Sequence, residues 1–342
     1  HSIAVTSCTS ALHLSLAALG FERGDEAIVP AFTWISTANV IEHLGGKVIF
    51  CDIDLNTFNI DVDKIEEKIT KRTKAILPVH LFGLPVEMDP VLEIAQKHNL
   101  LVVEDAACGF GSRYKENHVG TLGNAGCFSF HPRKSITTGE GGMITTNDHL
   151  LAEKLQILRD HGASMSDLQR HLGNRPYLLS DHPEAGYNQR MTDIQGALGS
   201  SQMDRASQIL LERKRLAERY DEAFKDLKWL RIPWREKSFE HAYQSYPCLF
   251  GIDPHAPNSV AIANKFRNHW IDNLFKDGIS TRPATHAVHM LTYYSKKYRL
   301  KPLDFPNAFA ADQLSISFPL FNGMRDEEQN HVIDKILQLN PF

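Results

Sequence analysis

Short apolar runs, many of them rich in β-branched residues, alternate with longer helical patterns through the first part of the chain, and this alternation limits the possible fold more than any other feature. The runs are IAV at 3–5, EAIVP at 26–30, KVIFCDID at 47–54, AILPVHLFG at 75–83 and LLVVEDAA at 100–107. Runs such as LLVV, apolar on both sides, are typical of strands in a mainly parallel sheet with helices on each face. The sequence therefore predicts an α/β fold, whose ligands bind beyond the carboxyl ends of the strands.

The second part of the chain has a different pattern. Residues 192–227 form a long, charged, amphipathic stretch that we interpret as one connecting helix, followed by a strand within 242–252 and a helix at 259–278. A chain of 342 residues, 42% of them hydrophobic, can fill one large domain and a smaller partner. We predict a large α/β domain over 1–200, and a connector helix with a small α+β domain over 201–342.

The charge balance argues against two classes of partner. With 37 basic and 41 acidic residues, the net charge of −4 provides no excess of positive field for nucleic acid or for an anionic membrane. No apolar run approaches the roughly 18 residues of a membrane span, and no leader pattern opens the chain. We expect a soluble protein, and the lack of an initiator Met indicates that this sequence begins inside a longer one.

Cysteine and histidine usage gives no sign of disulfides or of a metal site. The five cysteines are an odd number without a CxxC pair, which fits neither a disulfide framework nor a zinc knuckle, so a reducing cytoplasm is expected. The 17 histidines include no HExxH pair, so we expect no metal.

Three predicted strands end in residues that could carry chemistry. Thr9 and Ser10 follow the first strand at the start of a helical pattern, where hydroxyls and free N–H groups can hold a phosphate. Asp105 ends the LLVV strand among small residues, and Lys134 follows the strand-like CFSF in a segment rich in Thr, Gly and Glu. Taken alone, these features have simpler explanations as helix caps and a solvent-exposed lysine.

Together, the three groups meet the needs of pyridoxal phosphate: an anchor for its phosphate, an acid beside its ring nitrogen and an amine for a Schiff base. A lysine near the phosphate and the protonated ring can have its pKa lowered enough to act as a nucleophile and then as the general base. Trp34, at the end of another predicted strand, could stack on the ring, although a core aromatic at a helix start would give the same pattern.

Four segments, in this order and spacing, resemble the DegT/DnrJ/StrS family of PLP-dependent sugar aminotransferases: 2–54, VVEDAACGFGSRY, GCFSFHPRKSITTGEGGMITTND and GYNQRMTDIQGALG. The similarity resumes in GIST and ISFPLFNGM. The resemblance implies the aspartate-aminotransferase-like fold and a homodimer with a shared active site. It also implies transfer of an amino group from L-glutamate to a keto-sugar, usually nucleotide-linked, for cell-surface sugars such as those of lipopolysaccharide or for secondary metabolites.

The resemblance also implies a role for each residue at the site. Lys134 would be the Schiff-base lysine and Asp105 the partner of the ring nitrogen, while Trp34 would lie against the ring. Thr9, Ser10 and Ser129 would hold the phosphate. Asn188 would reach the phosphate in the neighbouring subunit.

The chain departs from the family pattern in three places. Cys108 stands where the family commonly has Gln or His, so the contact with the cofactor's ring hydroxyl is expected to be weaker or replaced. In RPATHAVHMLTYY, His289 is shared with the family's substrate loop, whereas Arg282 and His286 are particular to this chain and are expected to select the substrate. Family members also begin some tens of residues earlier, with a segment that helps to close the active site.

The identity of the acceptor stays open. The planar fork of Arg282 suits the diphosphate of a nucleotide-linked keto-hexose, and it suits equally the carboxylate of a free acidic sugar such as a 3-deoxy-octulosonate derivative. An ordinary surface arginine is the third reading.

Three other functions share parts of the pattern. A PLP-dependent sugar dehydratase has nearly all these motifs but carries histidine in place of the Schiff-base lysine, and this chain has Lys134. A nicotinamide oxidoreductase would share the α/β alternation, yet no GxGxxG follows the first strand. A non-catalytic sensor on the same fold would have no need to keep Lys134, Asp105 and Ser129 together.

Overall fold

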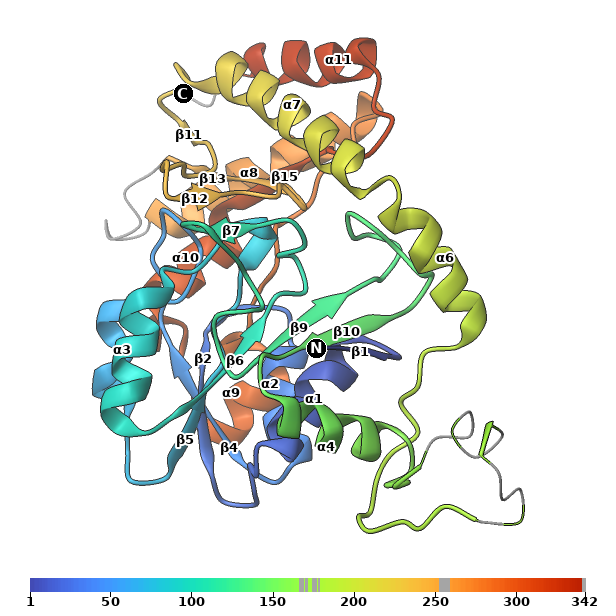
Figure 1. Ribbon diagram of the computed structural model, residues 1–342. Helices are drawn as coiled ribbons and strands as arrows, with labels where there is room; N and C mark the ends of the chain where they lie inside the picture. The colour runs from blue at the N-terminus through green and yellow to red at the C-terminus, as the bar shows by residue number, and fades with distance from the viewer. Residues whose placement is uncertain (166–168, 170–171, 174–176, 178, 252–258, 340–342) are drawn as a thin grey trace.

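The computed structural model describes residues 1–165, 169, 172–173, 177, 179–251 and 259–339 (Figure 1). Its centre is a seven-stranded sheet in which the pairings from β9 across to β4 are all parallel, and only β10 runs antiparallel to its neighbours. In spatial order the strands are β1 (Ser2–Val5), β10 (Gly142–Thr145), β9 (Ala125–Ser129), β6 (Leu101–Asp105), β5 (Thr73–Ile76), β2 (Glu26–Pro30) and β4 (Lys47–Cys51). The predicted mainly parallel sheet is confirmed.

Helices cover both faces of this sheet, as the doubly apolar strands predict. Ala27 and Val29 of β2 belong to the apolar cluster that includes α1 (Cys8–Ala18), whereas Ile28 between them belongs to the cluster that includes α3 (Met88–His98). Side chains of a strand alternate between its faces, so each face is packed against its own helices. On the α1 side lie also α2 (Ser36–His43) and α4 (His149–Arg159) (Figure 1).

The predicted connecting helix is two helices, not one. A capping box between Thr192 and Gln195 begins α6 (Asp193–Met203), and a turn separates it from α7 (Ala206–Phe224). The two differ in burial, because α6 has no buried residue and α7 buries a full apolar face. The break lets α7 turn onto the second part of the molecule, while α6 stands apart from the sheet (Figure 1). Continuous amphipathic spacing could not reveal this turn.

The second part has its own three-stranded antiparallel sheet, in the order β11, β13, β15. Its elements are β11 (Leu230–Arg231), β13 (Tyr246–Phe250), α8 (Ser259–Lys276), α10 (Pro306–Leu314), β15 (Ser315–Phe318) and α11 (Asp326–Leu337). The predicted strand within 242–252 and helix at 259–278 correspond to β13 and α8, although Ile252 lies outside the described residues.

Two small sheets join the parts of the chain. In one, β7 (Arg113–Tyr114) is the central strand and pairs with β12 (Phe239–Glu240) and β8 (Asn117–His118). The other pairs β14 (His286–Ala287) with β3 (Phe32–Thr33). α9 (Thr292–Tyr298) also packs on the first part, where the Tyr294 hydroxyl donates to Asn39 at 2.7 Å. A division of the chain at residue 200 stays a prediction. Short 3-10 helices complete the chain: Val62–Lys64, Glu66–Lys68, Leu81–Gly83, Val288–Met290 and Pro302–Asp304.

Within the described ranges, no helix has both the length and the apolar character needed to cross a bilayer.

Candidate active site

Asp105 ends β6 with its carboxylate buried and hydrogen-bonded. Thr37 Oγ1 donates to Oδ2 at 2.7 Å, and the backbone N–H of Ala107 donates to Oδ1 at 3.1 Å. The Cys8 sulfur lies 3.9 Å from Oδ1. Asp105 forms no direct ion pair within the described part of the chain, and the positive charge of Lys134 acts on it only from a distance, so the buried carboxylate is incompletely compensated. The site therefore suits a cationic group such as a protonated ring nitrogen.

The start of α1 gathers small hydroxyls around free backbone N–H groups. Ser7 is the N-cap and accepts from the N–H of Ser10 at 3.1 Å, while the hydroxyls of Thr6 and Ser10 lie 2.8 Å apart. Thr9 is in the first turn of the same helix. An N-terminal helix turn of this kind binds phosphate well, because its N–H groups are unpaired and the helix dipole is positive there.

A glycine brings this helix start against the sheet. A Cβ on Gly142 would lie 2.4 Å from the carbonyl carbon of Ser7, which no real side chain tolerates. Gly142 pairs in register with Ser129 across β10 and β9. Ser129 is therefore next to the strand position that contacts the helix start, so Thr9, Ser10 and Ser129 lie in one region of the structure.

Lys134 lies beside Cys108 in the turn that follows β9. Its Nζ donates to the Cys108 sulfur at 3.1 Å, and its backbone N–H donates to the carbonyl of His131 at 2.9 Å. Burial lowers the pKa of Lys134, but the neighbouring Cys108, Cys8 and Asp105 together hold the pKa above its usual value. The protein alone thus keeps the lysine protonated, and the lower pKa expected from the sequence depends on the charge of a bound cofactor.

Trp34 is the predicted ring-stacking residue, and 54% of it is exposed. Its carbonyl oxygen lies 3.2 Å from Thr37 Oγ1, the hydroxyl that donates to Asp105 at 2.7 Å. The Trp34 ring faces His286 at a centroid distance of 6.0 Å. The indole therefore lies close to the Asp105 end of the sheet with a large open surface, which a core aromatic would not have.

The segment that carries the predicted substrate residues crosses between the two parts of the molecule. Arg282 pairs through its backbone with Ser317 of β15, and His286 pairs with Thr33 of β3. Both side chains are exposed, and Arg282 forms no ion pair among the described residues. They are available to a ligand that approaches Trp34 from this side.

His289 is placed differently from these two residues. Its ring is fully buried, packs edge-on against Phe305 and has Nε2 3.2 Å from the carbonyl oxygen of Pro302. Burial also lowers the pKa of His289, so the ring is neutral. This placement does not support the prediction that His289 contacts the substrate, because the ring stays inside the fold of the segment.

Asn188 is exposed and pairs through its backbone with Asp160. The next residue, Gln189, accepts from the N–H of Thr6 at 3.0 Å, so the GYNQR segment runs beside the end of β1. The structure does not bring the Asn188 side chain into contact with the Lys134 region. Its role across a subunit interface stays a prediction.

Two residues at the site were missed by sequence reasoning. Thr37 donates to the buried carboxylate of Asp105, and Cys8 lies against the same carboxylate. Both follow predicted strands, Cys8 in TSCTS at 6–10 and Thr37 in WIST at 34–37. Their position directly after a predicted strand was the only sequence signal, and the same position is typical of ordinary residues in the first turn of a helix.

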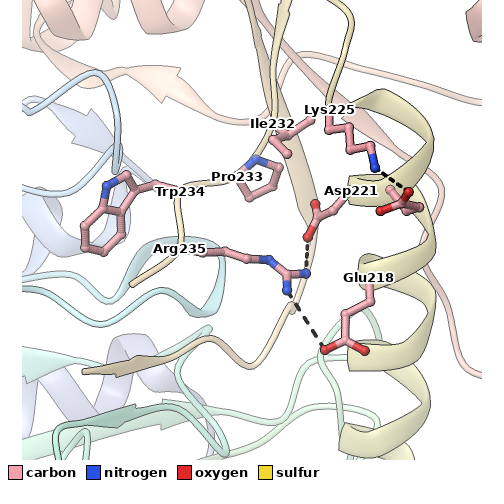
Figure 2. A pocket seen from close by; sticks show the side chains of 8 residues that line it. Glu218, Asp221, Lys225, Ile232, Pro233, Trp234 and Arg235 are labelled. Atoms are coloured by element: carbon pink, nitrogen blue, oxygen red, sulfur yellow. Dashed lines mark hydrogen bonds and ion pairs between the residues drawn. The ribbon is translucent and has the colours of Figure 1, made fainter. Parts of the chain in front are cut away.

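A separate pocket of about 510 Å³ lies far along the chain from these residues (Figure 2). Its acidic residues are already engaged, because Arg235 pairs with Asp221 and lies 3.9 Å from Glu218. None of the predicted site residues lines it; the lining residues are Glu218, Asp221, Glu222, Lys225, Ile232, Pro233, Trp234 and Arg235. We therefore locate the chemistry at the strand ends. In the described ranges, no group of three His, Cys, Asp or Glu side chains could hold a metal ion.

Comparison with known proteins identifies the family. The model of the DegT/DnrJ/EryC1/StrS aminotransferase family matches residues 1–337. The chain is 38% identical over 338 residues to the spore coat polysaccharide biosynthesis protein SpsC of Bacillus subtilis, a match that covers 98% of this chain and 84% of that protein. It is 38% identical over 340 residues to a GDP-perosamine synthase of Caulobacter vibrioides, with 99% and 85% covered.

Among solved structures, Spr1654 from Streptococcus pneumoniae in its PLP form has a TM-score of 0.87 and 29% identity, with 97% of this chain and 85% of that chain covered. The aspartate-aminotransferase-like fold and the pyridoxal phosphate cofactor predicted from the motifs are thereby confirmed. A nicotinamide oxidoreductase and a non-catalytic scaffold no longer fit. This chain belongs to the DegT/DnrJ/EryC1/StrS aminotransferase family, and it is a pyridoxal-phosphate-dependent sugar aminotransferase.

Proposed function

We propose that the enzyme moves the amino group of L-glutamate onto the carbonyl carbon of a nucleotide-linked keto-sugar. The assignment of the site depends mainly on Asp105, whose buried carboxylate forms no direct ion pair with any residue that the structure describes. Cys108, three residues later, contacts Lys134 Nζ through its sulfur. Pyridoxal phosphate, when bound, supplies a carbonyl that carries the amino group and a ring that accepts electrons from the reacting carbon.

Each residue of this chain then has a defined task. Lys134 would hold the cofactor through its aldehyde carbon, and its freed amine would carry the proton between the substrate carbon and that aldehyde carbon. Asp105 stays ionised beside the ring nitrogen, with Thr37 and the Ala107 N–H fixing its two oxygens. The start of α1, with Thr9 and Ser10, and Ser129 bind the phosphate.

Two further contacts with the cofactor remain. The open face of Trp34 stacks on the ring. Cys108 takes the place of the family's Gln or His and offers only a weak S–H donor to the ring hydroxyl. The contact between Lys134 Nζ and the Cys108 sulfur at 3.1 Å supports this role of the thiol.

The nucleotide linkage is supported by two observations. One relative is a GDP-perosamine synthase, whose name specifies a nucleotide-linked product. In this chain, Arg282 presents an exposed guanidinium without an ion-pair partner among the described residues, on the segment that leads to Trp34 through His286. A guanidinium binds phosphate oxygens through paired N–H groups.

The acceptor can be identified by a half-reaction. The enzyme is first loaded with L-glutamate, which should convert the bound cofactor to its aminated form, and carbonyl sugars are then added one at a time. We expect nucleotide-linked keto-hexoses to restore the absorbance of the covalently bound cofactor. Discharge only by a free acidic sugar, such as a 3-deoxy-octulosonate derivative, would overturn the nucleotide assignment.

Arg282→Ala provides a second test of the acceptor. Because the guanidinium would contact the diphosphate far from the reacting carbon, we expect KM for the nucleotide sugar to rise about tenfold or more with kcat nearly unchanged. Arg299→Ala, which removes another basic side chain, is the control. An unchanged KM in Arg282→Ala would contradict the proposed contact.

We further propose a cytoplasmic homodimer that shares its active sites and serves cell-surface sugar synthesis. α6 has no buried residue and exposes Ile194 by 85%, Leu198 by 43% and Met203 by 52%, which a second copy can cover. It directly follows the segment that carries the exposed Asn188. All five cysteines are free thiols, as in reducing compartments. Light scattering should give twice the mass of the chain, and an active monomer would contradict the dimer.

A further inference from the structure

Arg213 of α7 is a buried arginine whose partners are all neutral. Only 4% of it is exposed. Its Nε donates to the carbonyl of Tyr243 at 2.8 Å, one Nη donates to Asn322 Oδ1 at 3.3 Å, and the other donates to the carbonyls of Gln244 and Leu320. Burying a charged group without a counter-charge is costly. The four acceptors offset this cost and tie together two loops, 243–244 and 320–322.

Both loops contact the peptide groups on either side of Lys134. Gln244 Nε2 donates to the carbonyl of Arg133 at 2.9 Å, and Asn322 Nδ2 donates to the carbonyl of Ser135 at 3.4 Å. These are the residues immediately before and after Lys134. The backbone from which the lysine side chain extends is thus held at two points by side chains of the second part of the molecule.

The guanidinium fixes which way the Asn322 amide faces. A guanidinium can only donate hydrogen bonds, so the amide must present Oδ1 to Arg213, and its NH₂ group remains for the carbonyl of Ser135. Gln244 is oriented in a similar manner, because Ser245 Oγ donates to its Oε1 at 3.1 Å and leaves Nε2 for Arg133. Arg213 holds the Gln244 backbone at the same time.

We propose that Arg213 is a positioning residue for Lys134. It orients the Asn322 side chain and anchors the Gln244 backbone, and through them it sets the position of Lys134 Nζ relative to Cys108 and the cofactor. The inference rests on the proposed role of Lys134 as the attachment residue. A misplacement of about 1 Å at a reacting group can cost on the order of a hundredfold in rate, so a network of this kind can matter without touching the substrate.

The most specific test is Asn322→Asp. The carboxylate can still accept from Arg213, but it has no N–H to donate to the Ser135 carbonyl. We expect kcat to fall about tenfold, with KM for glutamate changed less than about twofold, because the change misplaces Lys134 rather than a binding group. The absorbance of the covalently bound cofactor should titrate at a pH shifted by about half a unit or more, since one pKa unit corresponds to about 1.4 kcal/mol of local interaction.

Two further variants complete the experiment. Arg213→Lys keeps the charge but loses the fork, and it should show the same shifted titration. Arg215→Met is the matched control, because Arg215 lies on the same helix and its one ion pair within the described ranges is with the surface residue Asp326 at 2.8 Å. The titration and kcat of this variant should equal those of the wild type. Melting curves of each variant separate a general loss of stability from an effect on the position of Lys134. If Arg213→Lys does not fold, Asn322→Asp alone tests the proposal.

The two proposals can fail separately. Borohydride reduction of the wild-type holoenzyme followed by peptide mapping should label Lys134, and a label on another lysine would overturn its proposed role. If Lys134 is labelled but Asn322→Asp keeps the wild-type kcat and titration, the positioning role of Arg213 is refuted. A lower melting temperature with an unchanged titration would likewise reduce Arg213 to a structural residue.

Discussion

Replacing Thr37 with valine removes one hydroxyl from the candidate site without changing its shape. Thr37 and Asp105 are both buried, and the hydroxyl donates to Asp105 Oδ2 at 2.7 Å. Valine fills nearly the same volume, so the variant creates no cavity, but it leaves a buried carboxylate oxygen without its donor. The loss of a hydrogen bond to a buried charged group destabilises a protein by about 2 kcal/mol.

This free energy converts to a measurable melting shift. Unfolding entropy is roughly 2.1 cal/mol/K per residue, which for 342 residues gives about 0.7 kcal/mol/K. A loss of about 2 kcal/mol therefore lowers the Tm of the cofactor-free protein by about 3 °C. Calorimetry at one fixed protein concentration measures this shift without interference from changes in oligomer population.

Thr33→Val is the matched control for this experiment. Thr33 is buried beside Thr37, with the two hydroxyls 3.4 Å apart, and it does not contact Asp105. We expect Thr33→Val to shift the Tm by clearly less than Thr37→Val, and only Thr37→Val to slow turnover of the holoenzyme. Equal shifts in the two variants would refute the reasoning, since the loss could then not be assigned to the Asp105 carboxylate.

Three other perturbations have defined outcomes. Asp105→Asn should bind the cofactor yet lose at least about a hundredfold in kcat, the scale of a single electrostatic stabiliser, and near-normal turnover would contradict its role. Gly142→Ala should weaken cofactor affinity about tenfold in a titration of the cofactor-free protein, because its Cβ would meet the backbone of Ser7 at 2.4 Å and displace the helix start; an unchanged affinity would place the phosphate elsewhere. Glu104→Gln should make the free energy of unfolding depend less on pH in acid. Burial raises the pKa of Glu104, but the hydrogen bonds from His80 and the backbone lower it by more, so the stabilisation from Glu104 is present above the unfolded pKa and is lost as pH falls through the folded pKa. An unchanged pH dependence of the acid unfolding in calorimetry would contradict this.

The central sheet was predictable because its strands carry their own signal. A run such as LLVV must be buried on both faces, and the structure indeed divides Val102 and Val103 of β6 between two apolar clusters. The direction of β10 was not predictable, because antiparallel pairing with β9 and β1 depends on how the 131–141 segment returns along the sheet. Hydrophobic pattern specifies burial, not strand direction.

The candidate site residues that follow strands could be predicted from the sequence. The residues that contact the site from segments distant in sequence could not. Lys134 and Asp105 follow strand patterns that can be read locally. Asn322 contacts the Lys134 turn across 187 residues of sequence, and Arg213 contacts Asn322 rather than the turn itself. Nothing in the local sequence around either residue distinguishes it from a solvent-exposed polar residue. For His289 the motif was misleading, because it predicted a contact with the substrate and the structure buries the ring in the core.

The adjacent acids at the end of β6 show why a motif locates a site without assigning its roles. Glu104 accepts from three backbone N–H groups, those of Gly120, Leu122 and Gly123, at 2.6–2.8 Å, and His80 Nε2 lies 3.0 Å away. Its acceptor positions are filled, so it anchors the 120–123 loop to the strand. Asp105 accepts hydrogen bonds from the Thr37 hydroxyl and the Ala107 N–H and has one long contact with the Cys8 thiol, all neutral, so part of its acceptor capacity remains. Because neighbouring side chains of a strand point to opposite faces, one residue step separates the structural carboxylate from the one that is free to bind a cation. The sequence could identify the pair, but only the count of donors around each carboxylate indicates which of them has acceptor capacity left for a cationic group.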